Sequence, residues 1–194
     1  MALLKKIKNL ILPLPVTLAT HRSKKGDEST DNIIALSWVG IVEHHPHMVN
    51  VVIGKGKYSA VTIAERKEFG LCIAPVELME QVDRCGYTHG STLDKFKMAG
   101  LTKMPAAKID VSLIVQCPIC LECVVTNIVP LKTHDMFIAE VVASHVAPIF
   151  LNEKEEPDIA KMNILCYAND QYWAMGQKLQ DLYYSKKDYN PKVL

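Results

Sequence analysis

A short segment rich in glycine and lysine has the composition of an anion-binding site. Gly54-Lys55-Gly56-Lys57 ends an apolar, strand-like stretch, and Tyr58-Ser59 begins a stretch with helical spacing. Backbone N–H groups at a helix start, a hydroxyl and positive charge are what a phosphate monoester binds. The spacing of a Walker-type phosphate loop is missing. A solvated turn before a helix capped by Ser59 explains the same residues, and the segment alone leaves both interpretations open.

A single hydroxyl lies within a mostly apolar segment that we expect to be a buried strand. Ser37 follows Ala35-Leu36 and precedes Trp38. A flat heteroaromatic ring binds in an apolar slot with a few polar atoms along one edge, and Ser37 with the adjacent backbone amides can supply that edge. The alternative is a core strand whose one hydroxyl bonds a neighbouring carbonyl.

A third segment combines glycines, hydroxyls and a lysine. It runs from Cys85-Gly86 to Lys95-Phe96 and includes Ser91. Its glycines allow the backbone to approach a ligand closely, and Lys95 adds a mobile positive charge. An ordinary connection between two helices is the alternative interpretation.

Three regularly spaced cysteines, Cys117-x2-Cys120-x2-Cys123, invite comparison with an iron–sulfur or zinc site. A bacterial ferredoxin motif would continue to a fourth cysteine and a proline, whereas Thr126-Asn127 stand there in this chain. On a strand, Cys117 and Cys123 face one side and Cys120 the other. We therefore expect buried structural thiols and no metal site.

The segment His44-His45-Pro46-His47 presents three imidazoles, but no carboxylate or cysteine ligand lies at a suitable spacing. We expect a tight connection between strands there, with a metal site as the alternative. Trp38, Tyr172 and Trp173 either stack on a ligand or fill core and interface positions.

Composition and charge exclude several classes of function. Hydrophobic residues make up 49% and charged residues 22% of the 194 residues, which is typical of a globular protein. A net charge of +1 gives no general attraction for nucleic acid or an anionic membrane, so we expect neither as a partner. No catalytic triad, Walker motif or dinucleotide fingerprint is present.

The cationic, amphipathic stretch Leu3–Leu12 has Leu10-Ile11-Leu12 as its longest apolar run, which is too short for a signal peptide or a membrane span. We expect this stretch to pack onto the domain. We also expect a cytoplasmic protein whose six cysteines are reduced.

The segments between these motifs are mostly strand-like. We expect strands at 16–20, 32–42, 48–53, 69–74, 111–129 with a break at Pro118, and 137–146. We expect helices at 58–67, at 77–84 with Gly86 beyond its end, at 92–100 with Ser or Thr at its start, and near 175–182. Strands and helices do not alternate regularly, which disfavours a doubly wound parallel sheet. The expected fold is mainly β, a mostly antiparallel barrel with helical inserts, in a single domain spanning residues 1–194.

Taken in order, these segments resemble the flavin reductase-like family, and the flavoredoxin-like proteins are the most similar subgroup. The resemblance covers the chain from about Pro13 to Leu182. The matching residues are Pro15-Val16-Thr17-Leu18-Ala19-Thr20, Asn32, Trp38-Val39-Gly40, Pro46, Lys55, Lys57-Tyr58-Ser59, Ile63, Phe69, Cys85-Gly86, Ser91, Asp94-Lys95-Phe96, Leu101-Thr102, Glu122-Cys123, Tyr167 and Tyr172.

The resemblance implies an FMN-binding split β-barrel that forms a homodimer, with FMN near the subunit interface. It implies that the strand around Ser37 lies along the isoalloxazine edge, that Lys57 and Ser59 hold the phosphate, and that the 85–95 loop closes over the flavin. The implied cofactor-binding residues are Asn32, Ala35, Leu36, Ser37, Trp38, Lys55, Lys57, Tyr58, Ser59, Cys85, Gly86, Ser91 and Lys95. No catalytic residue is implied, because hydride and one-electron chemistry belong to the flavin.

Two positions depart from the family pattern. The ring-edge positions commonly read Thr-Ala-Ser or Thr-Ser-Ser, whereas this chain has Ala35-Leu36-Ser37 and lacks the first hydroxyl. His89-Gly90-Ser91 shifts a Ser-Gly pair that is common in the family. More of the ring recognition is therefore left to backbone groups.

The resemblance leaves two classes of function open. The first is an FMN-dependent oxidoreductase or electron carrier that takes electrons from NAD(P)H or a redox protein. Within it, the flavin is either a diffusible substrate or a tightly bound carrier. The second is a redox-inactive split-barrel module for ligand binding or interaction, which the departure at Ala35 favours. Haem or coenzyme F420 on the same fold is a third, weaker alternative, since fold alone does not determine function.

Overall fold

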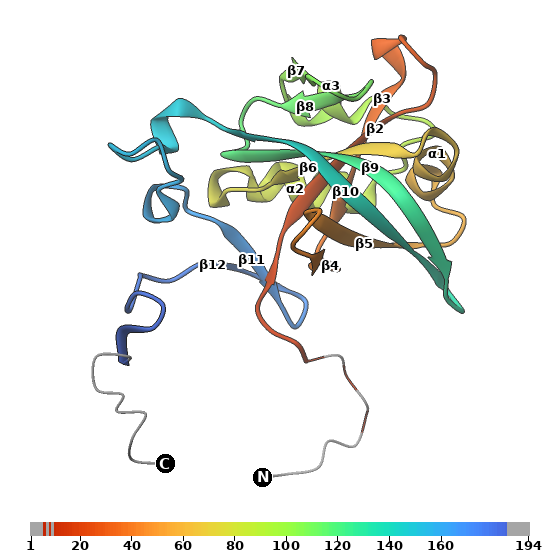
Figure 1. Cartoon of the computed structure of the whole chain (residues 1–194). Coiled ribbons are helices and arrows are strands. Elements are labelled where there is room, and N and C mark those ends of the chain that lie inside the picture. The colour runs from red at the N-terminus through yellow and green to blue at the C-terminus, as the bar shows by residue number, and fades with distance from the viewer. Residues whose placement is uncertain (1–5, 7, 9, 186–194) are drawn as a thin grey trace.

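The computed structural model describes residues 6, 8 and 10–185. Its largest part is a seven-stranded antiparallel sheet with the order β3-β2-β6-β9-β10-β5-β4 (Figure 1). In chain order its strands are β2 (Thr17–Arg22), β3 (Asp31–Leu36), β4 (Val39–Glu43), β5 (Met48–Gly54), β6 (Glu68–Ile73), β9 (Ile119–Pro130) and β10 (His134–Val146). Because β3 and β4 lie at opposite ends of this order, the sheet does not close on itself.

Two small sheets and the helices complete the described chain. The first small sheet consists of β1 (Leu14–Pro15), β11 (Leu165–Ala168) and β12 (Gln171–Ala174), and the second of β7 (Lys103–Pro105) and β8 (Ser112–Ile114). The helices are α1 (Tyr58–Arg66), α2 (Met79–Tyr87) and α3 (Lys95–Ala99), with 3₁₀ turns at Glu28–Thr30, Val76–Leu78, Pro148–Phe150 and Ile159–Lys161. The prediction of a mainly β split barrel with helical inserts is confirmed.

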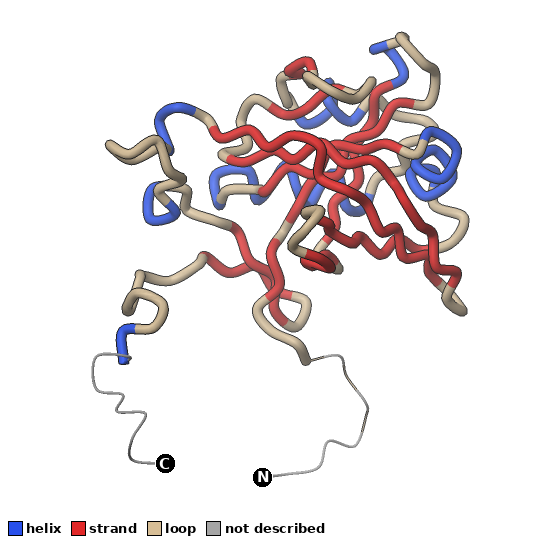
Figure 2. The backbone as a smooth tube through the Cα atoms, viewed as in Figure 1, coloured by secondary structure: helices blue, strands red, loops and turns tan. Residues whose placement is uncertain are grey.

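The two longest strands, β9 and β10, form a hairpin that bends across the sheet. Figure 2 shows both strands running from one side of the molecule to the other. Their pairing shifts register between Ile138 and Ala139 and again between Val141 and Ala143. Such bulges increase the local twist of a strand. The bend brings the turn before His134 beside the end of β5, where His134 pairs with Gly54.

Strand β2 is buried along its whole length and separates two apolar clusters. Leu18 packs in one cluster with residues of α2 and α3, and Ala19 packs in the other with residues of α1. Successive side chains of a strand point to opposite faces, which explains this division. Because β2 also contacts α1, its polar residue His21 is fully enclosed between strand and helix.

The expected strand 32–42 was wrong, because the segment forms two strands at opposite edges of the sheet. β3 ends at Leu36 and pairs with β2, whereas β4 begins at Val39 and pairs with β5. Both halves are apolar, so hydrophobicity does not mark the break. Ser37 and Trp38 therefore form the link between the two edges, where the Trp38 carbonyl accepts from the Val52 N–H at 3.0 Å.

The expected capping role of Ser59 was also wrong. Helix α1 begins at Tyr58, and its N-cap is Lys57, which makes no side-chain capping bond. Ser59 lies inside the first turn, where its hydroxyl pairs with His21 instead. Its burial therefore comes from tertiary packing that the local sequence does not reveal.

The other helices differ from the expected ones at their boundaries. Helix α2 continues through Gly86 to Tyr87, so Gly86 does not lie beyond its end. Helix α3 is capped by Asp94, whose carboxylate accepts from the Lys97 N–H, and not by a Ser or Thr. Its expected stop at Gly100 is confirmed by a φ of 64°. Residues 175–182 do not form the expected helix.

All six cysteines are free and buried, which confirms the prediction of structural thiols. The predicted division of faces was wrong. Cys117 packs with Cys120 and Cys72 in the cluster under α2 and α3, whereas Cys123 lies in the other cluster. Cys117 lies in the turn before Pro118, and β9 begins only at Ile119. The alternation of strand faces therefore does not extend back to Cys117.

The rings of His44, His45 and His47 lie 4.3 to 5.7 Å apart in the exposed turn between β4 and β5. This turn is the tight connection that the sequence predicts. Among the residues that the structure describes, no three His, Cys, Asp or Glu side chains are arranged to hold a metal ion.

The amphipathic stretch Leu3–Leu12 lies partly outside the described residues. Its described end remains exposed, and Ile11 shows 81% of its surface. Within residues 6, 8 and 10–185, no helix is long and apolar enough to cross a membrane.

We expect Gly70 in β6 to tolerate no side chain. A Cβ atom at this position would lie 2.6 Å from Leu113 Cδ2 and still closer to Thr20 Oγ1. Overpacking of this kind costs about 1–3 kcal/mol. The Gly70→Ala variant should therefore lose about that free energy of unfolding, measured by urea denaturation. Gly176→Ala is the matched control, since a Cβ there meets open space, and equal stabilities of the two variants would contradict the prediction.

Candidate functional site

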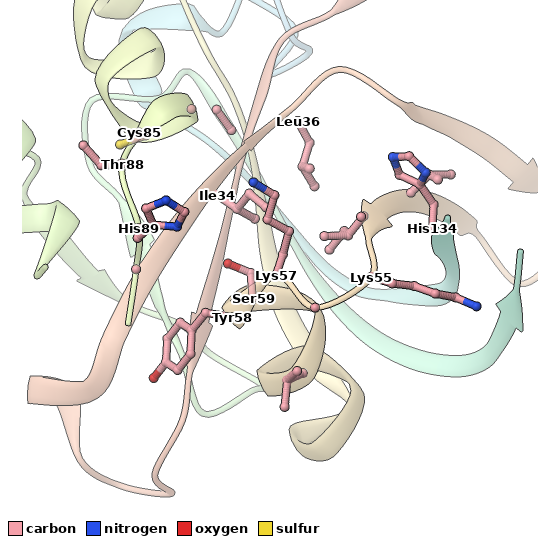
Figure 3. Close-up of a pocket in the computed structure, with 18 of the residues that line it drawn as sticks. Ile34, Leu36, Lys55, Lys57, Tyr58, Ser59, Cys85, Thr88, His89 and His134 are labelled. Carbon is pink, nitrogen blue, oxygen red and sulfur yellow. The ribbon is translucent and has the colours of Figure 1, made fainter. Parts of the chain in front are cut away.

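One cavity of about 800 Å³ brings together residues from four parts of the chain. It lies where the end of β3 and the following link meet the start of α1 and the segment from α2 to α3 (Figure 3). Of the predicted cofactor-binding residues, it is lined by Ala35, Leu36, Ser37, Trp38, Lys55, Lys57, Tyr58, Ser59, Cys85, Gly86, Ser91 and Lys95. The size is within the range of small-molecule sites.

Asn32 is the predicted residue that does not line this cavity. Its side-chain amide donates to the Gly90 carbonyl at 2.6 Å and to the Leu93 carbonyl at 2.9 Å. Both acceptors belong to the segment between α2 and α3, of which Gly90 and Ser91 line the cavity. Asn32 therefore holds the wall of the cavity in place from behind.

The start of α1 forms the polar end of the cavity. The first N–H groups of a helix have no carbonyl partner within the helix, so the backbone at Tyr58 and Ser59 attracts an anion. Gly56, with a φ of 77°, makes the turn that leads into the helix. In Figure 3 the Lys57 side chain points toward Ile34 and Leu36.

Lys55 differs from Lys57 in direction, although both line the cavity. Figure 3 shows the Lys55 side chain extending away from Lys57 and Ser59. Its Nζ lies 3.8 Å from Asp135 Oδ1, and the side chain is 44% exposed. Lys57 is therefore the better placed of the two for an anion at the start of α1.

Lys95 is a buried cation, and the prediction that its charge is mobile was wrong. The residue is 3% exposed, and its Nζ donates to the Cys85 carbonyl at 2.7 Å. Burial, which is the largest cause, and then the positive charge of Lys57 lower the pKa of Lys95. No carboxylate of the described chain lies within 4.0 Å of its Nζ. A buried cation without a counter-ion favours an anionic ligand.

The end of β3 forms an apolar wall that ends in one hydroxyl. Ile34, Ala35 and Leu36 are half-buried along it, and Ser37 follows at the link. A Cβ atom at Gly86 would lie 3.9 Å from the Ala35 Cβ, so α2 approaches β3 closely at this point. The missing hydroxyl at position 35 therefore coincides with a position where a helix packs against the strand.

The opposite side of the cavity carries an aromatic pair that the sequence does not predict. The Trp38 and His134 rings lie 5.0 Å apart between centroids, at an angle of 33°. His134 comes from the start of β10, and its register partner Gly54 also lines the cavity. Only the sheet pairing brings it here, so no local pattern could have shown it.

The other lining residues that the sequence analysis missed come from the same segments. They are Ile34, Val52, Ile53, Gly54, Gly56, Val61, Thr88, His89 and Gly90. Gly54 and Gly56 belong to the glycine- and lysine-rich segment already singled out, so that motif was the signal for them.

The Cys85 thiol at the cavity is not activated as a nucleophile. Burial raises the pKa of the Cys85 thiol to about 11, which keeps it protonated at neutral pH. Its backbone carbonyl and the neighbouring Gly86 form part of the wall instead. The arrangement offers apolar side chains at the end of β3, and lysines with the free N–H groups of a helix start at α1.

A buried histidine lies directly behind this cradle. His21 Nε2 is 2.8 Å from Ser59 Oγ, and the ring contacts Tyr58 edge-on with a centroid distance of 5.7 Å. Its other nitrogen, Nδ1, is buried without a hydrogen-bond partner among the described residues. An unpaired buried polar atom costs free energy in a folded protein.

We expect His21 to make stability depend on pH. Burial, the largest cause, and then the charge of Lys95 lower the pKa of His21 from 6.5 to about 3. Between these values the unfolded chain binds a proton that the folded chain does not. The contribution to stability is therefore complete above pH 6.5 and is lost as the pH falls toward 3. At about 1.4 kcal/mol per pKa unit, the loss amounts to several kcal/mol.

The His21→Phe variant keeps a ring of similar size and removes this titration. Its free energy of unfolding, measured in urea at a series of pH values, should fall less steeply with acid than that of the parent protein. Buried carboxylates such as Glu122 titrate in both proteins, so the difference between the two curves isolates His21. Parallel curves would contradict the prediction.

An open antiparallel sheet that holds an apolar slot beside an anion cradle defines a protein of the split-barrel class. The chain belongs to the family of the flavin reductase like domain, whose model matches residues 10–176. The resemblance that the sequence motifs indicate is thereby confirmed.

Solved structures and sequences of relatives agree with this assignment. The chain is similar to the flavoredoxin of Desulfovibrio vulgaris (Miyazaki F), with 26% identity, a TM-score of 0.87 and coverage of 96% of this chain and 100% of that one. For the flavoredoxin of Methanosarcina acetivorans the identity is 27%, the TM-score 0.84 and the coverage 96% and 99%. An uncharacterized protein of Archaeoglobus fulgidus is 29% identical over 128 residues, which are 66% of this chain and 71% of the relative. Together with the family, these likenesses support a flavin-related redox role.

The residues present fit a flavin that carries a phosphate. The buried charge of Lys95, which has no carboxylate partner among the described residues, matches an anionic group, as do Lys57 and the helix start. The wall from Ile34 to Leu36 offers the apolar surface that a flat ring system requires.

Proposed function

We propose that the chain binds FMN in this cavity and works as a flavin-dependent oxidoreductase or electron carrier. The observation that carries the proposal is the buried Lys95, a cation without a carboxylate partner in the described chain, at a cavity that also has an apolar slot. FMN joins a flat ring to a single phosphate monoester, and both features have a counterpart in the cavity. When bound, FMN supplies hydride and one-electron chemistry.

In this proposal the chain binds, orients and shields the cofactor. Ser37 and the backbone of the link after β3 hydrogen-bond the ring edge. Lys57, Ser59 and the N–H groups at the start of α1 hold the phosphate, while Lys95 neutralises its charge from within. Gly86 and Ser91 belong to the segment that closes over the ring.

The first experiment is a visible absorption spectrum of the purified protein, taken before and after FMN is added and the excess removed. A bound oxidised-flavin spectrum that bleaches on anaerobic reduction supports the proposal. Failure of the protein to retain FMN removes the carrier version, and failure of free FMN to turn over with NADH or NADPH removes the reductase version as well.

The electron donor is proposed as NAD(P)H or a redox protein. Two versions make different predictions for flavin retention. A carrier keeps FMN through extensive dialysis and turns over slowly with NADH, whereas a reductase loses it and turns over rapidly when free flavin is supplied.

A redox-inactive binding module is the second candidate, and Ala35 is the observation that favours it. Its missing hydroxyl leaves Ser37 as the side-chain hydroxyl at the end of β3 that lines the cavity. If a bound flavin keeps its oxidised spectrum with nicotinamide, with dithionite and with redox proteins, this second function is correct and the first is wrong.

We propose a homodimer whose interface includes a second, neighbouring cavity. That cavity shares Trp38 and Val52 with the first and is also lined by Leu10-Ile11-Leu12. Ile11, which lines this cavity, is 81% exposed, and Ile41, which follows the lining residue Gly40 on an edge strand, is 87% exposed, so both are available for a partner subunit to cover. Sedimentation equilibrium tests the proposal, and a monomer mass at micromolar concentration would overturn it.

We further propose that residues 1–194 act as one domain in the cytoplasm. The family model spans residues 10–176 as one unit, and all six thiols are free, as in a reducing compartment. Limited proteolysis that releases two stable fragments would contradict the single domain.

A further inference from the structure

His21 makes a hydrogen bond to the proposed phosphate site. Its Nε2 lies 2.8 Å from Ser59 Oγ, and Ser59 lines the cavity whereas His21 does not. The imidazole is fully buried between β2 and the first turn of α1, with Tyr58 against its edge. Its Nδ1 has no partner among the described residues.

The hydrogen bond between His21 and Ser59 has two possible directions, one for each tautomer of the ring. Burial keeps the ring neutral at neutral pH, so it carries one proton, on either Nδ1 or Nε2. With the proton on Nδ1, Nε2 accepts from the Ser59 hydroxyl. The hydroxyl hydrogen of Ser59 then points to His21 and not into the cavity. With the proton on Nε2, Ser59 Oγ accepts from the ring and its own hydrogen is free to donate.

A phosphate oxygen at neutral pH only accepts hydrogen bonds. Ser59 can therefore contribute to phosphate binding only as a donor, and its Oγ must then accept from His21. Packing alone does not explain the residue, because a phenyl ring would fill the same space without leaving Nδ1 unpaired.

We propose that His21 is a positioning residue that donates from Nε2 to Ser59 Oγ and thereby directs the Ser59 hydroxyl hydrogen toward the phosphate monoester of the cofactor. The inference rests on the proposed function and deepens it, since it assigns selectivity for the phosphorylated flavin over the free flavin to a residue outside the cavity wall.

Fluorescence titrations with FMN and riboflavin test this role. In His21→Phe and in Ser59→Ala, the Kd for FMN should rise about tenfold, the worth of one hydrogen bond to a charged group, while the Kd for riboflavin stays within about twofold. The double variant should lose no more than either single variant, because both changes remove the same hydrogen bond. Unchanged FMN binding in His21→Phe, an equal loss for riboflavin, or losses that multiply would overturn the inference.

The tautomer of His21 gives a second readout that needs no variant to be stable. Long-range ¹H–¹⁵N correlation spectra of the FMN-saturated protein distinguish the two ring nitrogens. We expect the proton on Nε2, and a proton on Nδ1 in the complex would overturn the inference even if His21→Phe failed to fold. The parent protein separates the two proposals. If it binds neither FMN nor riboflavin, the proposed function and the inference both fail, whereas normal FMN binding by His21→Phe removes the inference alone.

Discussion

Replacing Lys95 with methionine should weaken FMN binding about 10- to 100-fold without destabilising the empty protein. Lys95 is 3% exposed and has a carbonyl, but no carboxylate of the described chain, as partner. A charge-assisted hydrogen bond to phosphate contributes about 1.5–3 kcal/mol, which corresponds to this change in Kd. Lys95 and Lys57 both line the cavity, and the charge of Lys57 lowers the pKa of Lys95. We therefore expect both to act on the phosphate, and the loss should be much smaller for riboflavin.

Although FMN binding should weaken, the stability of the empty Lys95→Met protein should not fall. A buried ammonium without a counter-ion is unfavourable, and methionine fills a similar volume without charge. The Cys85 carbonyl loses its donor, which offsets part of the gain. The free energy of unfolding of the empty protein should therefore stay within about 1 kcal/mol of the parent value or rise.

Lys97 offers the matched control, because it lies on the same helix but is exposed. Lys97→Met should change neither FMN affinity nor stability noticeably. A Lys95→Met protein that binds FMN as tightly as the parent would show that the buried charge serves structure and not the cofactor. That result would remove the observation on which the proposed function depends.

Local patterns predicted where the helix at the polar end of the cavity begins. The glycine and lysine spacing before Tyr58 placed a helix start there, and α1 begins at that residue. The role of Ser59 within it was missed, because its partner His21 lies 38 positions earlier in the chain. Hydrogen bonds of this kind arise from tertiary packing, which residue spacing along one segment cannot encode.

At the proposed ring end of the cavity, the family resemblance was informative and the local patterns were not. The resemblance indicated the stretch from Ala35 to Trp38, although the expected continuous strand was wrong. An apolar strand that stops and one that continues have the same hydrophobicity along the sequence, so the pattern does not show that the second half becomes an exposed edge strand. His134 could not be predicted from the sequence for a different reason, since it joins the cavity only through its pairing with Gly54 in the sheet.

The hairpin of β2 and β3 connects the cavity to the most charged part of the interior. Along its register, His21 pairs with Asn32, and Arg22 pairs with Asp31. The first pair supports the cavity, through Ser59 and through the 85–95 segment. The second pair belongs to a buried ion network that lies next to the first pair on the same hairpin.

Replacing Arg22 with methionine should cost about 3–5 kcal/mol of unfolding free energy, the usual result of removing one partner of a buried ion pair. Arg22 Nε lies 2.6 Å from Asp31 Oδ1, and Nη1 lies 2.5 Å from Asp110 Oδ1. The Asp31 side chain is 1% exposed, so its carboxylate would remain buried with Lys103 at 3.3 Å and Ser112 as its partners. The remaining charge of Lys103 places the expected loss at the lower end of this range.

Two comparisons decide whether the loss comes from an uncompensated charge. Arg84→Met removes an exposed pair with Glu80 and should cost about 0.5 kcal/mol or less. Arg22→Met combined with Asp31→Leu removes both charges and should recover stability relative to Arg22→Met alone, as measured by urea denaturation. If the double variant is instead less stable than Arg22→Met, Asp31 stabilises the fold through Ser112 and Lys103 without Arg22. The loss in the single variant would then reflect missing packing around the arginine stem and not a stranded carboxylate.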